Sequence, residues 1–344
     1  MALIHFGLPS PEVWKFPNLN TPVAPSPFLC QLLTQLYEAS MKVTTPMTIA
    51  IVYFTSVHFI NPIVRKRQLN KYYAKAGAKG DSKAANPKKL PAAPYSISQT
   101  AWFRVFVLVH NIFLCAYSAW TFLGMTSSIV SNMEFFKGSI LPSFFQDQEF
   151  TYRKVEVFFQ LICDSKQGVF SRLLNDTGIH NLEVFGFWFY ISKFYEVIDT
   201  IIILLKGRES SLLQSYHHAG AMMCMWAGIR FQSPPIWIFV VFNSFIHSLM
   251  YFYFSLSCLH IRVPNIFKRL LTTLQITQFV IGGSIAILHA FVWIIDTSTS
   301  GELELISCIS NPDQALSILI NVAYLTPLTM LFGAFYIDSY LKRK

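Results

Sequence analysis

The sequence predicts an all-α membrane protein with seven transmembrane helices, an N-terminus on the non-cytosolic side and a C-terminus in the cytosol. Three observations predict this class: the composition, the number of long apolar stretches and the distribution of Lys and Arg between them. Of the 344 residues, 53% are hydrophobic and only 13% are charged, whereas soluble domains carry about 25% charged residues. This composition excludes disordered, collagen-like and small disulfide-rich proteins. The net charge of +9 indicates cytosolic loops rather than nucleic-acid binding.

Seven stretches are apolar over the length of about 20 residues that a helix needs to cross the hydrocarbon core. In chain order, we expect the spans at 46–64, 101–126, 183–205, 212–229, 235–256, 270–295 and 314–337. They would form one domain at residues 46–338, between an N-terminal tail at 1–45 and a short basic tail at 339–344.

The loops between these spans differ in charge. Of the Lys and Arg residues outside the spans, 17 lie on the side that includes residues 65–97 and 8 lie on the other side. Because cytosolic loops are enriched in Lys and Arg, we expect 65–97, interpreted as a flexible basic linker, in the cytosol. The tail 1–45 and the loop 127–182 are then lumenal. Within the tail, residues 28–37 are either an interfacial helix or a loosely packed apolar segment.

The six cysteines show no metal-binding spacing. In the predicted topology Cys163 and Cys308 lie in loops on the oxidising side of the membrane, where disulfides persist. We therefore expect a bridge between them and free thiols at the other four positions. The one glycosylation sequon begins at Asn175, in a loop on the same side, which makes Asn175 a candidate glycosylation site.

The third predicted span contains three charged residues. Lys193, Glu196 and Asp199 recur every three residues and are followed by Thr200. Residues three apart share one face of a helix, and charges that face lipid are costly. We therefore expect this face to point toward other helices.

Three later spans carry polar clusters as well. They are Gln214, His217 and His218 in the fourth span, Asn243, His247 and Tyr251 in the fifth, and Thr272, Gln275 and Gln278 in the sixth. At a rise of 1.5 Å per residue, the clusters lie about 8–14 Å from the cytosolic ends of their spans. Antiparallel helices would bring four clusters to one depth, which predicts a shared cavity in the cytosolic half of the membrane.

The histidines of this cavity suit two kinds of chemistry. Neutral imidazole is a nucleophile and a general base near neutral pH, which predicts acyl transfer. Imidazole and carboxylate also bind zinc or iron, but a dinuclear centre needs several histidine boxes, and the remaining histidines are not boxed. We therefore predict no metal site, and we interpret lone histidines such as His58 and His110 as packing residues.

In this order, the motifs resemble the ELO family of very-long-chain fatty acid elongases, the membrane 3-ketoacyl-CoA synthases. The family pattern K-x-x-E-x-x-D-T matches residues 193–200, and H-x-x-M-Y with a preceding Asn matches 243–251. The pattern T-x-x-Q-x-x-Q matches 272–278. The histidine box, commonly H-x-x-H-H, departs from the family because Gln214 stands at its first position, which leaves substrate preference open.

The resemblance implies a protein of the endoplasmic reticulum membrane in which six helices form a barrel around an acyl tunnel. It implies that a long-chain acyl-CoA condenses with malonyl-CoA, giving a 3-ketoacyl-CoA two carbons longer, CO2 and CoA, without a cofactor. Membrane lipid and the ketoacyl reductase, dehydratase and enoyl reductase of the elongation cycle are the implied partners, and a homo-oligomer is compatible with it.

Roles for individual residues also follow from the resemblance. His217 would attack the acyl thioester to form an acyl-imidazole, and His247 would assist decarboxylation of malonyl-CoA, while His218 and Asp199 would orient the histidines. The implied substrate-binding set is Lys193, Glu196, Thr200, Gln214, Asn243, Tyr251, Thr272, Gln275 and Gln278. The basic residues expected at a mouth for CoA phosphates are Lys206, Arg208, Arg262, Lys268 and Arg269, although the orientation rule alone would also place them there.

Two other classes share parts of this pattern. A seven-helix receptor would share the topology but would not require stacked polar clusters at cytosolic depth. A transporter could use buried charges as a proton relay, but paired repeats would be expected. Release of CoA from acyl-CoA and malonyl-CoA separates the enzyme from both.

Overall fold

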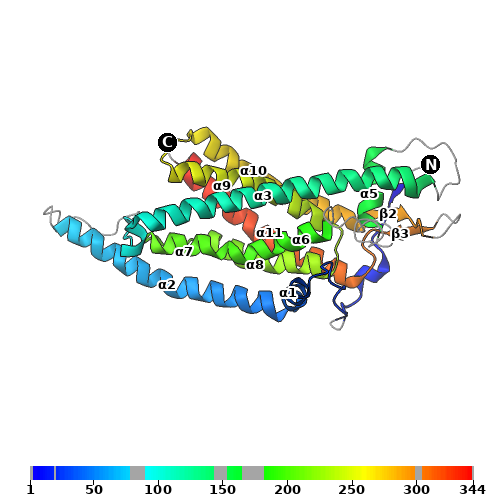
Figure 1. The fold of residues 1–344 in the computed structure, drawn as a ribbon, viewed down its shortest axis with the longest axis horizontal. Coiled ribbons are helices and arrows are strands. Elements are labelled where there is room, and N and C mark those ends of the chain that lie inside the picture. Colours follow the sequence, from blue (N-terminus) through cyan, green and yellow to red (C-terminus); the bar gives the residue numbers. More distant parts are fainter. Residues whose placement is uncertain are drawn as a thin grey trace.

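The computed structural model describes residues 3–18, 21–77, 90–142, 153–164, 182–298 and 304–342. Long helices run side by side along the longest axis of the molecule (Figure 1). A small sheet and the short helix α5 (Lys154–Cys163) lie together at the end that holds the N-terminus. The C-terminus lies toward the opposite end.

The long helices follow the predicted spans in order. They are α2 (Thr44–Gly77), α3 (Ala101–Phe135), α6 (Leu182–Tyr195), α7 (Val197–Leu205), α8 (Leu212–Arg230), α9 (Ile236–Cys258), α10 (Asn265–Leu288) and α11 (Pro312–Tyr336). A π-helical turn extends α3 through Phe136–Ile140, and another extends α11 through Ile337–Leu341.

Within the described residues, five helical stretches are long and apolar enough to cross a membrane, namely those built on α2, α3, α9, α10 and α11. This fits a multi-pass membrane protein. The predicted third span is divided into α6, of 14 residues, and α7, of 9 residues. The fourth, α8, is 19 residues long but begins with its polar cluster. These two spans therefore stay predictions.

The helices pack in a continuous order. Helix α3 contacts α9, α9 contacts α10, α10 contacts α11, and α11 contacts α8. Helix α8 contacts α6, which returns to α3, while α2 packs outside against α8 and α7. The polar faces of α6, α7, α8, α9 and α10 can therefore meet in one interior space.

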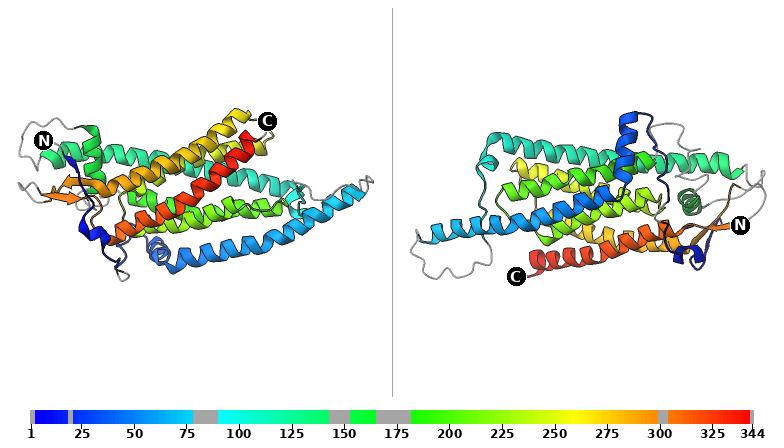
Figure 2. Two further views of the ribbon diagram at one scale, coloured as in Figure 1. Left: turned by 180° about the vertical axis from the view of Figure 1, so that it is seen from behind. Right: turned by 90° about the horizontal axis from the view of Figure 1, so that it is seen from below.

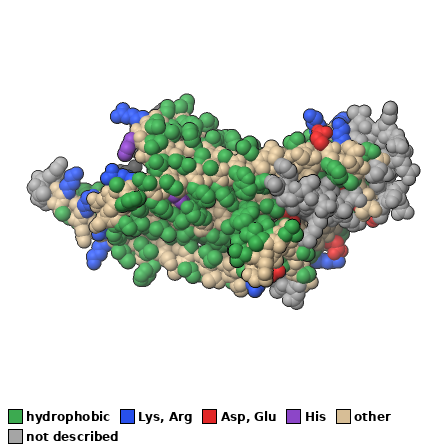
Figure 3. Space-filling view, in the orientation of Figure 1, with side chains coloured by type: hydrophobic (Ala, Val, Ile, Leu, Met, Phe, Trp, Pro, Cys, Tyr) green, Lys and Arg blue, Asp and Glu red, His purple; other side chains and the backbone are tan. Residues whose placement is uncertain are grey.

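Apolar side chains cover the middle of the molecule, and Lys and Arg gather toward its two ends (Figure 3). Phe59 on α2 and Phe113 on α3 are among the exposed large apolar residues of this middle part. An exposed apolar surface of this extent is typical of contact with lipid.

The short helix α1 (Gln31–Met41) crosses the end of the bundle at a steep angle to the long helices (Figure 2). Its carbonyl groups are held by buried donors: the hydroxyl of Tyr190 donates to Ser40 O (2.9 Å), and the indole of Trp226 donates to Met41 O (2.9 Å). Of the two alternatives for residues 28–37, the structure therefore supports a helix.

A three-stranded antiparallel sheet closes the same end. Strand β2 (Val292–Ile295) pairs with β1 (Ile4–Phe6) on one side and with β3 (Leu305–Ser307) on the other. Helix α5 contacts β1 and β2. A disulfide joins Cys163 at the end of α5 to Cys308 beside β3, the pair expected from the predicted topology. The other four cysteines are free.

The expected end of the sixth span is wrong. Helix α10 ends at Leu288 and a 3-10 turn follows, so residues 292–295 form a strand rather than the last helical turn. The segment Val292–Ile295 consists of β-branched and aromatic residues, which fit a strand, and its partner β1 comes from the N-terminal tail.

The prediction of a flexible linker at 65–97 is also wrong for most of its described residues. Helix α2 continues to Gly77 because no Gly or Pro follows Pro62 before it, and Lys, Arg, Gln and Ala are good helix formers. The last part of the predicted linker is tied back to this helix. Arg67 Nε donates to Ala93 O (3.0 Å), and Lys71 Nζ donates to Ala92 O (2.8 Å).

The predicted lumenal loop 127–182 begins late, because α3 runs without a break to Phe135. Residues 78–89, in the middle of the predicted linker, and Asn175, the glycosylation candidate, lie outside the described residues.

Candidate active site

The site is built around a break between α6 and α7. Helix α6 ends at Tyr195 and α7 begins at Val197, with Glu196 between them. The amide of Glu196 still bonds to Ser192 O (2.9 Å), but the amide of Asp199 bonds to Glu196 O (3.1 Å), three residues back. Short 3-10 geometry within a longer helical run is common at functional sites.

Glu196 is the centre of a buried polar group. Lys193 Nζ lies 2.7 Å from its Oε1, and Ser192 Oγ donates to the same oxygen at 3.2 Å. His247 Nδ1 lies 3.6 Å from Oε1 and His218 Nδ1 lies 3.9 Å from Oε2. The two imidazole atoms and Glu196 Oε2 are buried and lack hydrogen bonds within the described residues. A small shift of these side chains would complete both contacts, so Glu196 can stabilise positive charge on either ring.

Lys193 connects this group to α9. In addition to its ion pair with Glu196, Lys193 Nζ donates to Asn243 Oδ1 (3.1 Å) and lies 4.0 Å from the centre of the Phe189 ring. A buried charge is tolerated when it is paired and hydrogen-bonded. The expected pairing of Lys193 with Glu196 is therefore present, and it positions Asn243 as well.

Three histidine rings meet between α8 and α9. The ring centre of His217 lies 5.4 Å from that of His218 and 6.2 Å from that of His247. Gln214 Nε2 lies 2.8 Å from His218 Nε2 and 3.5 Å from Thr200 Oγ1. The amide at the variant position of the histidine box thus holds His218 by a hydrogen bond, with a group that does not titrate.

Asp199 belongs to a second cluster. His110 Nε2 donates to Asp199 Oδ1 at 2.7 Å, and the hydroxyl of Tyr251 donates to Asp199 Oδ2 at 2.6 Å. Among the described residues both carboxylate oxygens of Asp199 accept from donors outside the histidine box, so the expected role of Asp199 in orienting the box stays a prediction. Tyr251 in turn presents its ring edge to His247, with 5.8 Å between ring centres.

His110 is a site residue that sequence reasoning interpreted as a packing residue. It lies in the apolar helix α3 and is 1% exposed. Its only adjacent polar residue is Asn111, and no polar cluster at helical spacing surrounds the pair. The signal that was available is the His110-Asn111 pair itself, since two adjacent polar residues in the interior of an apolar span are costly without partners.

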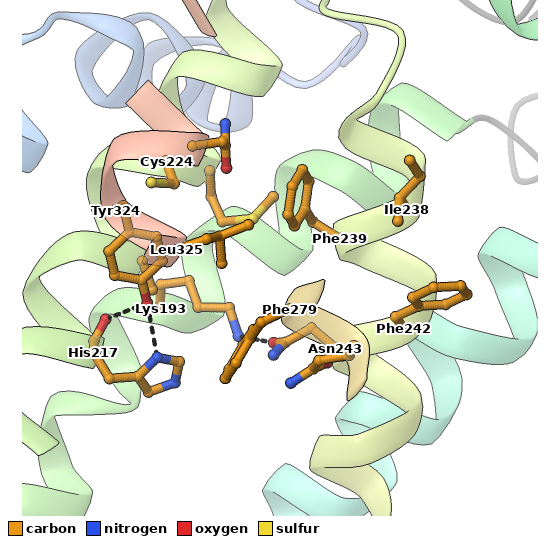
Figure 4. Close-up of a pocket in the computed structure, with 14 residues that line it drawn as sticks. Lys193, His217, Cys224, Ile238, Phe239, Phe242, Asn243, Phe279, Tyr324 and Leu325 are labelled. Carbon is orange, nitrogen blue, oxygen red and sulfur yellow. Dashed lines mark hydrogen bonds between the residues drawn. The ribbon is translucent and has the colours of Figure 1, made fainter. Parts of the chain in front are cut away.

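Tyr324 on α11 is the second residue that was missed. Its hydroxyl lies 2.8 Å from His217 Nδ1 and donates to His217 O at 3.0 Å (Figure 4). No motif contains this tyrosine, and only the packing of α11 against α8 brings it to the histidine box.

A cavity of about 720 Å³ lies in front of the histidines. It is lined by eight of the predicted catalytic and substrate-binding residues, namely Asp199, Gln214, His217, His218, Asn243, His247, Gln275 and Gln278. The lining does not include the predicted site residues Glu196, Thr200, Tyr251 and Thr272. Thr200 bonds to Tyr53 (2.8 Å) and Thr272 bonds to Lys268 O (3.1 Å).

A smaller apolar pocket continues from the other side of His217. It shares His217, Asn243, Gln278 and Phe279 with the large cavity and adds Lys193. Its further lining is largely apolar and includes Ala221, Met225, Ile238, Phe239, Phe242 and Leu325 (Figure 4). His217 therefore lies where the large cavity, which carries the polar site residues, meets the smaller apolar pocket.

The residues of the predicted basic mouth have different surroundings in the structure. Of its five residues, only Lys206 lines the cavity. Helix α10 begins at Asn265, before the predicted span, and its first turns direct Lys268 toward the ring of Tyr253 and Arg269 toward Tyr336. Arg208 and Arg262 are exposed outside the cavity lining. Arg104 lines the cavity together with Lys206 and His260.

No group of three or more His, Cys, Asp or Glu side chains is arranged to hold a metal ion in the part of the chain that the structure describes.

Known proteins resemble this chain over the region that contains the site. The model of the ELO family, described as GNS1/SUR4, matches residues 39–344. Fatty acid elongase 2 of Trypanosoma brucei brucei is 28% identical over 164 residues, which cover 46% of this chain and 58% of that protein. Fatty acid elongase sre1 of Dictyostelium discoideum is 33% identical over 187 residues, which cover 53% of this chain and 60% of that protein.

A longer match is to fatty acid elongase 2 of Trypanosoma cruzi, 25% identical over 262 residues, which cover 75% of this chain and 80% of that protein. The chain thus spans less than two thirds of the first two relatives. No solved structure gives a significant match. Because the family model matches most of the chain and includes every polar motif of the site, the protein belongs to the ELO family.

Proposed function

We propose that this protein is a fatty acid elongase that condenses a long-chain acyl-CoA with malonyl-CoA. The products would be a 3-ketoacyl-CoA two carbons longer, CO2 and CoA. The observation that carries the proposal is the position of His217, which lines both the large cavity and the apolar pocket. An acyl thioester whose tail begins in the apolar pocket would have its carbonyl carbon beside this ring.

The proposal includes a membrane arrangement. The α6–α7 pair, interrupted at Glu196, would count as one span and α8 as another, giving seven. Six of them would form a barrel in the packing order α3, α9, α10, α11, α8 and α6, with α2 outside. The excess of Lys and Arg on one side favours a cytosolic C-terminus, and we propose the endoplasmic reticulum as the location.

The first step would be attack by the unprotonated imidazole nitrogen of His217 on the acyl thioester. A carbon–nitrogen bond forms, the carbon–sulfur bond breaks, and the CoA thiolate leaves toward the cavity. Arg104 and Lys206 line that cavity and would interact with the phosphates of CoA. The amides of Asn243 and Gln278, which line both cavities, would hold the carbonyl oxygen.

The second step would use malonyl-CoA. Loss of CO2 leaves an electron pair on the adjacent carbon, which attacks the acyl group and releases His217. His247 lies across from His217 and would assist by hydrogen bonding to the malonyl thioester oxygen, with Glu196 stabilising its charge. This condensation requires no cofactor. Reduction and dehydration of the product would fall to the other enzymes of the elongation cycle, and membrane lipid surrounds the site.

The test is product formation by the purified protein in detergent micelles or vesicles. With a saturated long-chain acyl-CoA and isotopically labelled malonyl-CoA, mass spectrometry should detect a labelled 3-ketoacyl-CoA and one CoA thiol for each condensation. His217→Ala should form neither above background. Absence of product and of CoA release across a series of chain lengths, from protein that remains folded and monodisperse, would contradict the proposal.

A further inference from the structure

The hydroxyl of Tyr324 makes two contacts with the same residue. It lies 2.8 Å from the ring nitrogen Nδ1 of His217 and 3.0 Å from the backbone oxygen of His217. A phenol has one proton to donate, and a carbonyl oxygen can only accept. Both contacts are therefore hydrogen bonds in only one arrangement: Tyr324 donates to the backbone oxygen, and Nδ1 of His217 carries a proton that it donates to the Tyr324 oxygen.

This arrangement decides the state of the other ring nitrogen. In a neutral imidazole only one nitrogen carries a proton, so a proton on Nδ1 leaves a lone pair on Nε2. Within the described residues Nε2 has no hydrogen-bond partner, and His217 lines the cavity. We propose that Tyr324 is a positioning residue that holds His217 in the Nδ1-protonated tautomer, so that Nε2 is the nucleophile. This inference rests on the proposed function.

The ring of Tyr324 packs closely against α8. Its ring stacks on Tyr216, with ring centres 5.6 Å apart, and packs against α8 at Gly220. A Cβ atom added at Gly220 would lie 2.3 Å from two carbons of the Tyr324 ring. Only glycine at this position lets the ring approach the backbone of α8 closely enough for its hydroxyl to reach both atoms of His217.

With His217 in the Nδ1-protonated tautomer, the bonds, electrons and protons of the proposed reaction balance. When Nε2 forms its bond to the acyl carbon, the thiolate leaves and takes a proton from solvent, while Nδ1 keeps its proton and the ring becomes an acyl-imidazolium. Its charge is stabilised by the Tyr324 oxygen. When the decarboxylated malonyl carbon forms the new carbon–carbon bond, the electrons of the carbon–nitrogen bond return to Nε2. The starting tautomer is regenerated without transfer of a proton to or from the ring.

The experiment compares acylation in Tyr324→Phe and Gly220→Ala with two matched controls, Tyr216→Phe and Gly283→Ala. The Tyr216 control removes a hydroxyl that donates to the backbone oxygen of Tyr324 (3.3 Å) and not to His217, and a Cβ at Gly283 meets Leu325 at an ordinary 3.6 Å. Acyl transfer from a saturated acyl-CoA is followed by rapid quenching and intact mass. We expect the first two variants to acylate at least about tenfold more slowly, with half-saturation by acyl-CoA changed less than about threefold and both controls near the parent.

A rate for Tyr324→Phe equal to that of the parent would overturn the inference while leaving the elongase proposal intact. No acyl increment on the parent itself would overturn the acyl-imidazole step on which the inference depends. A second measurement is made on the parent protein, so it does not depend on the folding of a Tyr324 or Gly220 variant. The ¹⁵N resonances of His217 in the labelled parent, assigned by their loss in His217→Ala, should show a protonated Nδ1 and an unprotonated Nε2, and the reverse pattern would overturn the inference.

Discussion

Lys193 and Glu196 form a buried ion pair across the end of α6, with 2.7 Å between Nζ and Oε1 and 3% of each side chain exposed. The same carboxylate faces His218 and His247. Both charges are removed from solvent in a region that would lie within the bilayer, where an unpaired charge is costly. One ion pair thus stabilises the helix break and the electrostatic surroundings of two histidines.

Replacing Lys193 by Met should strongly destabilise the protein, because the carboxylate of Glu196 then stays buried without its partner. Breaking a buried pair in this way costs about 3–5 kcal/mol. The double variant Lys193→Met with Glu196→Gln should lose less than the sum of its two single variants, since no unpaired charge remains. Thermal unfolding in detergent measures all three, and losses that simply add would contradict the pairing.

Removing the hydroxyl of Tyr251 should weaken the second cluster. Tyr251→Phe leaves Asp199 Oδ2 without its donor, and because the Asp199 side chain is 16% exposed, the loss should lie at the lower end of the range of about 1–3 kcal/mol for an unsatisfied acceptor. Tyr253→Phe on the same helix is the control, because the Tyr253 ring lies beside Lys268 outside this cluster. Equal losses of thermal stability in the two variants would show that the hydrogen bond to Asp199 contributes little.

The disulfide at the sheet should give non-additive effects. Cys163→Ser and Cys308→Ser should each lower stability by about 2–4 kcal/mol, and the double variant should lose no more than either, because one bond is lost in all three cases. Melting temperatures of the three variants without reductant measure this cycle. A double variant with the summed loss of the singles would indicate independent roles for the two cysteines.

The apolar pocket behind His217 should limit acyl length. Phe239 contributes a ring to its wall, so Phe239→Ala should admit longer tails. Because each buried methylene contributes about 0.8 kcal/mol, the preference for a substrate longer by two methylenes should rise about tenfold. Phe245→Ala is the control, since Phe245 is 40% exposed on the same helix. Competition between two acyl-CoA lengths measures the ratio, and an unchanged ratio in Phe239→Ala would place the tail elsewhere.

Much of the site could be predicted because its residues recur at helical spacing. The three-residue steps of Lys193, Glu196 and Asp199, and the similar clusters on α8, α9 and α10, indicated that polar faces of several helices meet at one depth. Eight of these residues line one cavity in the structure. Periodicity and depth are local properties of a span, so they can be read without knowledge of the packing.

The remainder depends on contacts between distant segments. His110 and Tyr324 each stand outside any motif, and only the packing of α3 and α11 gives them partners. The pairing of Ile4 with Ile294 joins segments almost 300 residues apart. The positions of basic side chains around the cavity could not be predicted, because charge in a loop reports the side of the membrane and not the direction of a side chain, as Arg269 shows by binding Tyr336.

The most direct test of the central claim is the intact mass of the purified protein after incubation with a saturated long-chain acyl-CoA alone, beside His217→Ala. The account predicts an increment of one acyl group on the parent and none on His217→Ala. An increment that persists in His217→Ala would move the nucleophile to another residue. Ketoacyl product formed on addition of malonyl-CoA, with no increment at any chain length, would contradict the acyl-imidazole and indicate direct condensation.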